Sequence, residues 1–190
     1  SYSFENITNN GLNLFASTTT NGILKSTNEG TSWESANNGL ANLSISRIKS
    51  FGANLFASSL GGGIFKSSNN GVNWISKNTG LQRLTVSDLL ISNSRIIAGT
   101  GVSGIFYSND SGENWLNSNA RIQTLTINSM CSNNFFLFAC VNEGVFRSSD
   151  NGNTWTFLDN GFQSSSVHSL NAKGNLVFCG STSNGVFKST

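Results

Sequence analysis

The stretch SSDNGNTW, Ser148 to Trp155, recurs along the chain at a nearly constant interval. The three other copies are STNEGTSW, SSNNGVNW and SNDSGENW, and they end at Trp33, Trp74 and Trp115. Successive tryptophans are therefore 41, 41 and 40 residues apart. A fifth period begins at NGVFKST and reaches Thr190. Self-similarity at this period predicts one domain, residues 1–190, built from small units packed side by side.

Each period contains four short runs typical of antiparallel strands. In the second period they are ISRIKSF (45–51), NLFASS (54–59), IFKSS (64–68) and WISKN (74–78). The runs are rich in Ile, Leu, Val and Phe and are bounded by Gly, Asn and Ser, and no stretch keeps a helical spacing. Four-stranded units at this period predict an all-β fold, a β-propeller of about five blades.

The composition excludes several classes of function. Charged residues make up 11% of the chain and the formal net charge is +2, with the basic residues scattered. Nucleic acid or an anionic membrane surface would require clustered Lys and Arg, so we expect neither as a partner. No apolar run approaches the roughly 20 residues of a membrane span, and no signal peptide is evident. The three cysteines lack metal-site or disulfide spacing and are expected to be small buried hydrophobes.

The octet S-x-D-x-G-x-T-W resembles the Asp-box, or BNR repeat, of sialidases, sortilin-type receptors, some xyloglucan hydrolases and photosystem II assembly factors. SSDNGNTW matches the pattern fully, whereas SNDSGENW has Asn114 in place of Thr, and the first two copies have Asn at the acidic position. The residues that match the box are Asn28, Gly30, Trp33, Asn69, Gly71, Trp74, Asp110, Gly112, Trp115, Asp150, Gly152 and Trp155.

The resemblance implies that each octet is the hairpin between the third and the outermost strand of a blade. The blades then span about residues 3–36, 44–77, 85–118, 125–158 and 165–190, and the last lacks its outermost strand. Either the ring closes with a three-stranded blade, or strands from elsewhere complete it. An unfinished blade exposes a strand edge, which makes self-association possible.

Two interpretations of the octet compete, a structural turn and a cation-binding loop. In the structural one, Gly152 has a positive φ, Asp150 accepts backbone hydrogen bonds and Trp155 covers the blade. Calcium binding is disfavoured because no D-x-[DN]-x-[DN]-G pattern is present and Asn28 and Asn69 replace the acid. We therefore expect no metal and no cofactor.

A ligand site is expected on the opposite face, formed by the loops from outer to next inner strand and from second to third strand. Gln82, Gln123 and Gln163 share one repeat position, with Ala41 in the remaining copy. Their amides could bind a ligand or pair with loop backbone. The other candidates are Arg83, on the same side, and Arg47, Asp88 and His168 on the inner strands, where Arg47 and Asp88 could form an ion pair.

Three functions are open to such a scaffold. Sialidase chemistry is disfavoured because the chain has no proline for the Arg-Ile-Pro motif. A glycosidase needs two carboxylates about 5–10 Å apart, and Glu5, Asp88 and Glu143 belong to different blades. We therefore expect a non-catalytic binding or scaffold propeller that recognises a protein or a glycan, with a glycoside hydrolase or a lectin-like propeller as the alternative. The Asn- and Ser-rich repeats resemble secreted or surface proteins, so an extracellular, cell-surface or periplasmic location is expected.

Overall fold

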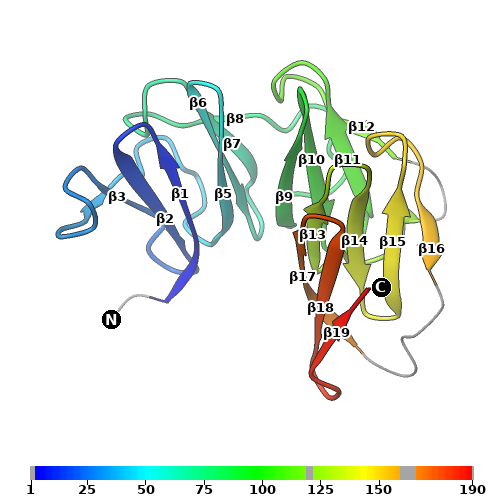
Figure 1. The fold of residues 1–190 in the computed structure, drawn as a ribbon. Coiled ribbons are helices and arrows are strands. Elements are labelled where there is room, and N and C mark those ends of the chain that lie inside the picture. Colours follow the sequence, from blue (N-terminus) through cyan, green and yellow to red (C-terminus); the bar gives the residue numbers. More distant parts are fainter. Residues whose placement is uncertain (1–2, 119–121, 159–165, 190) are drawn as a thin grey trace.

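The computed structural model describes residues 3–118, 122–158 and 166–189 (Figure 1). Its strands follow one another along the chain in five groups. The first group is β1 (Phe4–Asn10), β2 (Asn13–Thr18), β3 (Ile23–Ser26) and β4 (Glu34–Ser35). The second is β5 (Ile45–Phe51), β6 (Asn54–Ser59), β7 (Gly63–Ser67) and β8 (Ile75–Ser76). The third is β9 (Val86–Ser92), β10 (Arg95–Thr100), β11 (Ile105–Ser108) and β12 (Leu116–Asn117). The fourth is β13 (Ser129–Ser132), β14 (Leu137–Val141), β15 (Gly144–Ser148) and β16 (Thr156–Leu158), and the fifth is β17 (Val167–Lys173), β18 (Leu176–Ser181) and β19 (Val186–Lys188).

Each group is one antiparallel sheet, in which neighbouring strands are consecutive in sequence. We call these sheets blades 1 to 5. Blades 1 to 4 have four strands, and blade 5 has three strands within the described residues. The expected all-β class and the short last blade are thus confirmed. The outermost strands are only two or three residues long, shorter than the expected WISKN run, because the octet turn occupies their beginning.

The apolar core lies between the blades rather than within any one of them. Four clusters of buried side chains each combine residues from two consecutive blades. Phe15 and Ile23 of blade 1, for example, pack with Ile48, Leu55 and Trp74 of blade 2. A single blade exposes both faces of a small sheet, so burying them against the next blade supplies most of the stabilisation.

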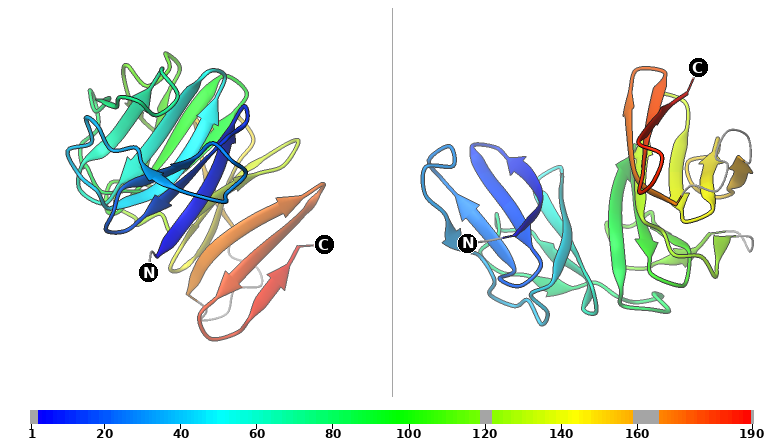
Figure 2. Two further views of the ribbon diagram at one scale, coloured as in Figure 1. Left: turned by 90° about the vertical axis from the view of Figure 1, so that its left-hand side faces the viewer. Right: turned by 90° about the horizontal axis from the view of Figure 1, so that it is seen from below.

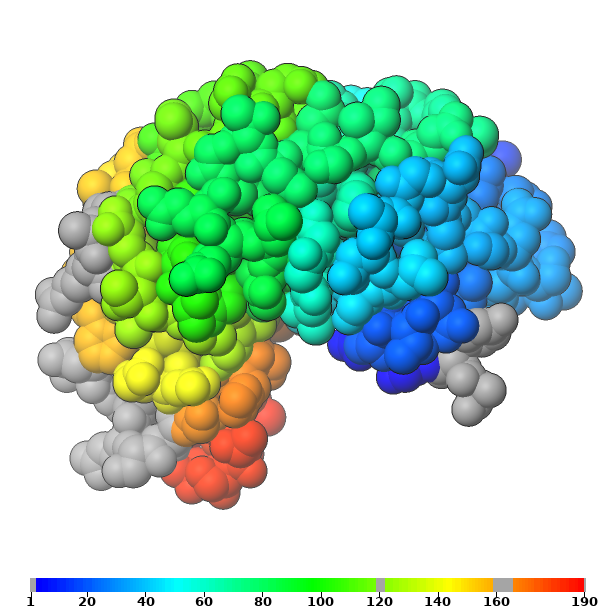
Figure 3. All heavy atoms as spheres, turned by 180° about the vertical axis from the view of Figure 1, so that it is seen from behind, coloured from blue at the N-terminus to red at the C-terminus, as the bar shows by residue number. Residues whose placement is uncertain are grey.

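The first strand of each blade lies on the inner side of the assembly, where β1, β5, β9, β13 and β17 contact one another in sequence order. The blades follow one another around an open arc, with the two chain ends on its two separate ends (Figure 2). The space-filling view leaves blades 1 and 5 apart (Figure 3). Closure into a ring by these five blades, one of the two expected outcomes, is therefore not what the described residues form.

Candidate functional site

Two sets of loops meet on one face of the blades. One set, residues 37–44, 78–85 and 122–128, leads from one blade to the next, and the other, residues 19–22, 60–62 and 101–103, joins second to third strands. The backbone amides of Gly22, Gly63 and Gly104 donate to the carbonyls of Leu43, Leu84 and Leu125 at 2.9, 2.8 and 3.2 Å. The two sets therefore form one surface, the loop face, while the octet turns lie at the other ends of the strands.

Asparagine side chains hold these loops in place. The Asn37 Oδ1 accepts the backbone N–H of Ile23 at 2.7 Å, and its amide group donates to the carbonyl of Asn21 at 2.8 Å. Asn78 repeats both contacts in blade 2, with Ile64 at 2.8 Å and Gly62 at 3.0 Å. Each amide thus satisfies loop backbone groups on both sides, which organises the surface before any ligand arrives.

The loop face carries a row of exposed apolar side chains. Leu43, Leu60, Leu84 and Val102 are 41%, 45%, 41% and 58% exposed, and Leu125 is half-buried. Leu43, Leu84 and Leu125 occupy one repeat position, so the row is encoded by the repeat itself. Sequence reasoning missed these residues because a leucine in a loop resembles an ordinary core residue; their recurrence every 41 residues outside the strands was the available signal.

The predicted loop residues fall beside this row. Gln82 and Arg83 are exposed and directly precede Leu84. Gln123 is exposed as well, but its amide donates to the carbonyl of Ser118 at 3.1 Å, so in this copy the expected pairing with loop backbone is present. Gln163 lies outside the described residues. The structure thus places Gln82 and Arg83, rather than Gln123, as polar groups open to a ligand beside the apolar row.

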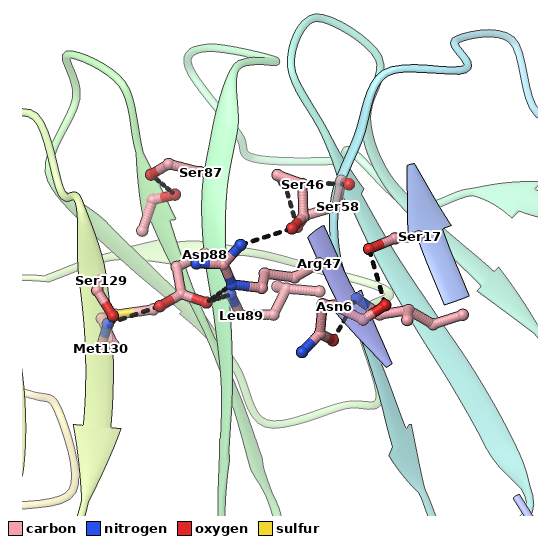
Figure 4. A network of polar contacts seen from close by, with 12 residues as sticks. Asn6, Ser17, Ser46, Arg47, Ser58, Ser87, Asp88, Leu89, Ser129 and Met130 are labelled. Atoms are coloured by element: carbon pink, nitrogen blue, oxygen red, sulfur yellow. Dashed lines mark hydrogen bonds and ion pairs between the residues drawn. The ribbon is translucent and has the colours of Figure 1, made fainter. Parts of the chain in front are cut away.

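Arg47 and Asp88 form the expected ion pair, with Arg47 Nε 3.0 Å from Asp88 Oδ1 (Figure 4). Asp88 is buried, and its carboxylate also accepts the backbone N–H groups of Leu89 at 2.8 Å and Met130 at 2.6 Å. Burial raises the pKa of Asp88, and the Arg47 charge and these hydrogen bonds oppose that rise. Both carboxylate oxygens are engaged with the protein, so Asp88 joins blades 2, 3 and 4.

Figure 4 shows that this pair belongs to a series of polar links between inner strands. Asn6, Asp88 and Ser129 occupy one repeat position, and each accepts a backbone N–H of the next blade, from Ile48 at 3.2 Å, Met130 at 2.6 Å and Leu170 at 3.3 Å. In blades 2, 3 and 4, the side chain one repeat position earlier donates instead to a carbonyl of the next blade. These links are Ser46 to Val86 at 2.6 Å, Ser87 to Ile127 and Asn128 to Val167 at 2.8 Å.

These links engage most of the polar side chains of the inner strands with the protein itself. The residues before Asn6, Arg47 and Asp88 are bulged, because the strand register shifts there. A bulge aims two successive side chains along the sheet toward the neighbouring blade. Most of the polar inner positions therefore connect blades. His168 occupies the bulge of blade 5 and is exposed, at the end of the series.

The four octets adopt the same turn. In the fourth copy, Asp150 Oδ1 accepts the backbone N–H of Thr154 at 2.9 Å and Ser148 Oγ at 2.8 Å, and Asp150 Oδ2 accepts Thr154 Oγ1 at 2.6 Å. Gly152 has φ +88°, as predicted, and Asn151 before it also has a positive φ, of +56°, which the sequence did not suggest. Two successive left-handed residues reverse the chain tightly.

The octets with Asn keep the backbone hydrogen bond of the turn without a charge. Asn28 Oδ1 and Asn69 Oδ1 accept the backbone N–H groups of Ser32 and Asn73, both at 2.9 Å. Within the described residues, no cluster of three or more His, Cys, Asp or Glu side chains could hold a metal ion. The carboxylate or amide oxygen at this position therefore acts as a hydrogen-bond acceptor for the turn.

The electrostatics of the two acidic octets follow from these contacts. Hydrogen bonds from the Asn114 backbone and side chain lower the pKa of Asp110 to about 2. Partial burial acts to raise the pKa of Asp150, but the hydrogen bonds from Thr154 and Ser148 outweigh it and lower that pKa.

The three cysteines are free and buried, as expected, and burial raises their thiol pKa values to about 11 or 12.

Comparison with known proteins identifies the fold. No protein-family model matches the sequence, and no curated protein matches it. Among solved structures, the extracellular domain of BT4673 from B. thetaiotaomicron matches 98% of this chain with a TM-score of 0.80 at 15% identity. YCF48 bound to D1 peptide matches 99% of it with a TM-score of 0.73 at 20% identity, and an ancestral GH74 enzyme matches 100% with a TM-score of 0.73 at 15% identity.

This chain spans only part of those proteins, 27% of BT4673, 63% of YCF48 and 31% of the GH74 enzyme. At such low identity the likeness concerns the fold alone. Within its described residues the chain has no helix that is long and apolar enough to cross a membrane. The five antiparallel sheets and these neighbours together show that the chain folds as consecutive blades of a β-propeller.

Proposed function

We propose that this chain is a non-catalytic binding propeller whose loop face recognises a protein segment with apolar side chains. The observation that carries the proposal is the row of Leu43, Leu60, Leu84 and Val102, exposed on loops that are held in place by side-chain amides. Exposed apolar residues gathered on one surface mark sites of protein contact. Gln82 and Arg83 at the edge of the row supply polar contacts.

Two features favour a protein over a sugar as the ligand. Sugar sites usually offer an aromatic platform, whereas three of the four tryptophans, Trp74, Trp115 and Trp155, are buried between blades. Gln123, one of the amides that a lectin site would use, is engaged with the carbonyl of Ser118. The structural likeness to YCF48 bound to a peptide is consistent with peptide recognition by this fold.

The proposal assigns no catalytic residue. Asp88 is the buried carboxylate on the inner strands, and Arg47, Leu89 and Met130 occupy both of its oxygens. The acids of the octets, Asp110 and Asp150, are used in their own turns. We regard the octets as Asp-box repeats with a structural role. We also propose a location outside the cytoplasm, in line with the extracellular domains among the structural neighbours.

Selection from a random peptide library tests the proposal. Peptides selected on this chain should carry apolar side chains and should bind the Leu60→Ser, Leu84→Ser variant at least about tenfold more weakly, because single apolar contacts at an interface are worth roughly 1 to 2 kcal/mol. Val72→Ser is the matched control, since Val72 is 59% exposed on an octet turn at the opposite ends of the strands. Titration calorimetry measures each affinity.

The outcomes separate the proposal from its alternatives. Selected peptides that bind both variants equally would place the binding surface elsewhere. Binding on a glycan array that is lost in Gln82→Ala would favour the lectin alternative. Hydrolysis of aryl-glycosides that is lost in Glu143→Gln would overturn the non-catalytic assignment.

A further inference from the structure

A polar pocket of about 420 Å³ lies between blades 3 and 4, at the strand ends that carry the octets. Three segments form its walls: the β9–β10 hairpin of blade 3 (residues 91–93), the β13–β14 hairpin of blade 4 (residues 132–137) and the fourth octet (residues 148, 149 and 151). All three belong to blades that have four strands. The pocket therefore lies inside the array of blades, and no residue of blade 5 lines it.

The pocket results from a small side chain at one repeat position of the upstream hairpin. Asn10, Phe51 and Ser92 are equivalent in blades 1, 2 and 3. In blade 1, Asn10 Nδ2 donates to Asn70 Oδ1 of the next octet at 3.3 Å and bridges the gap. In blade 2, Phe51 packs against the core cluster between blades 2 and 3. Ser92 is too short for either contact, so the space beside the fourth octet stays open.

The fourth octet lacks the hydrogen bond that Asn10 supplies to the second octet. Asn151 is the equivalent of Asn70 and lines the pocket, and its Oδ1 is buried and accepts no hydrogen bond from the described residues. A buried acceptor without a donor destabilises the folded state. In the second octet the donor comes from the side of the upstream hairpin, and the pocket occupies that side of the fourth octet. A hydroxyl group bound in the pocket is therefore the donor that Asn151 lacks.

The rest of the lining offers neutral polar groups and aromatic surface. Within the described residues, four asparagines and four serines line the pocket and no charged side chain does, so the site suits an uncharged ligand. The side chains of Ser92, Asn134 and Ser149 hydrogen-bond to none of the described residues, which leaves their amide and hydroxyl groups open to a ligand. Phe135 and Phe136 add two aromatic rings to the wall.

Hydrogen bonds hold the walls in position. Asn133 Oδ1 accepts the backbone N–H groups of Phe135 and Phe136 at 3.0 and 2.8 Å, which fixes the tip of the blade 4 hairpin. Arg95 Nη1 donates to the carbonyl of Asn151 at 2.7 Å, which ties the octet to blade 3. A site whose walls are fixed before binding loses little conformational entropy when it is occupied.

We propose that this pocket binds a neutral sugar unit. Sugar hydroxyls both donate and accept hydrogen bonds and so match amide and serine groups, while the apolar face of a sugar ring packs on an aromatic ring. The uncharged lining disfavours a phosphate, a carboxylate or an amine, because such a group would be buried without a counter-charge. One sugar hydroxyl donates to Asn151 Oδ1, and others contact Ser92, Asn134 and Ser149. The volume of the pocket is typical of small-molecule sites. This site lies opposite the loop face and does not depend on the function proposed for that face.

A panel of free neutral sugars tests the proposal: glucose, galactose, mannose, xylose and N-acetylglucosamine. Each sugar is titrated into the isotope-labelled chain and followed by two-dimensional amide NMR. At least one should shift the amide signals of Ser92, Asn134 and Asn151 saturably, while the signals of the loop face, such as that of Gln82, stay unchanged. The proposal is wrong if no sugar of the panel shifts these signals, or if the shifts gather on the loop face.

A variant that fills the pocket locates the site. Ser92→Asn places in blade 3 the amide that Asn10 has in blade 1, so it should donate to Asn151 Oδ1, occupy the pocket and weaken sugar binding by at least about tenfold. Its Tm should rise, because a buried acceptor gains a donor. Ser94→Asn is the matched control, since Ser94 is exposed on the same hairpin and does not line the pocket. Equal affinity of the two variants for the sugar contradicts the assignment of the site.

A second variant removes the amide that the sugar would contact. Asn151 has φ +56°, a conformation that glycine adopts without strain, so Asn151→Gly should keep the turn and lower the affinity for the sugar by at least about tenfold. Asn70→Gly is the matched control, because Asn70 also has φ +56° but lies in the second octet, away from the pocket. Unchanged binding in Asn151→Gly, or an equal loss in Asn70→Gly, overturns the proposal.

Discussion

The space between blades 2 and 3 and the space between blades 4 and 5 are lined by equivalent residues. The first space is filled by side chains, whereas the second is an open pocket. In the first, Trp115 and the turn at Gly112 cover Phe56, which is fully buried. In the second, Phe138 lines an open pocket. The difference teaches that the core of one blade is closed by the next, since the octet turn and the tryptophan of the downstream blade cover the upstream one.

The same rule explains the other end of the arc. Blade 1 has no blade before it in the described chain, and its Phe4 and Ile7 are 53% and 57% exposed. The equivalent residues of blade 2, Ile45 and Ile48, are fully buried. Trp33 likewise is half-buried, whereas the other three tryptophans are buried. Side chains at the same repeat position therefore contribute differently to the stability of the fold, according to their place in the arc.

The largest effect is expected from removing an enclosed tryptophan. Trp115→Ala should lower the free energy of unfolding by about 3–5 kcal/mol, because it leaves a cavity between blades 2 and 3 and a carbonyl of Lys77 without its donor. Trp33→Ala should lower it by only about 1–2 kcal/mol, since that side chain is half-buried. Urea unfolding of both variants measures the contrast. Equal losses would show that burial between blades is not what distinguishes these positions.

An intermediate effect is expected at the octet glycines. Gly71→Ala should destabilise the protein by about 2–3 kcal/mol, because Gly71 has φ +80° and the added methyl group would meet Phe15 of blade 1 at 2.6 Å. Gly30→Ala has a similar strain, with φ +85°, but its methyl group has no neighbour closer than 3.7 Å. It should therefore show the backbone strain alone, about 1 kcal/mol. Thermal unfolding compares the two, and a larger loss for Gly30→Ala would contradict the packing argument.

The smallest effect on stability is expected when the pH is lowered. The folded pKa of Asp110 is lowered to about 2 and that of Asp150 is also lowered, so both carboxylates contribute stability above their unfolded pKa near 3.8. That contribution is lost as the pH falls from about 4 toward 2. Asn28 and Asn69 do not titrate, so blades 1 and 2 lack this loss.

The Asp110→Asn, Asp150→Asn variant measures the pH-dependent stability that the two carboxylates contribute. Its Tm should fall less between pH 5 and pH 2.5 than the Tm of the unchanged chain, because the amide oxygen keeps the turn at both pH values, as it does in Asn28. If the Tm values of the two proteins fall by the same amount across this pH range, the octet acids contribute nothing to the loss of stability in acid.

Much of the fold followed from the repeat alone. Four octets at one spacing placed the strands of every blade, and they predicted the turn at Gly152 and the short fifth blade. Asn151 with its positive φ was not predicted, because Asn is only permissive of that conformation and the turn as a whole imposes it. The outer strands were predicted too long, since their first residues belong to the octet turn.

The candidate site was predicted less completely. The pairing of Arg47 with Asp88 followed from their positions on successive inner strands. The leucines of the loop face were missed, because exposure depends on which loops lie side by side, and hydrogen bonds such as that from Gly63 to Leu84 decide that only in the folded chain. The polar links from Ser46 and Ser87 were missed because both residues lie at bulges that aim their side chains at the next blade.

The sequence by itself determined what is local and periodic, which is the strand order, the turn chemistry and the number of blades, because each rests on residue types at fixed spacing. Only the tertiary structure decided which equivalent positions are filled and which are open. Phe56 and Phe138 have the same place in the repeat and the same side chain, and the covering turn and tryptophan come from the next blade. Burial is a property of neighbours in space, so identical repeats acquire different roles along the arc.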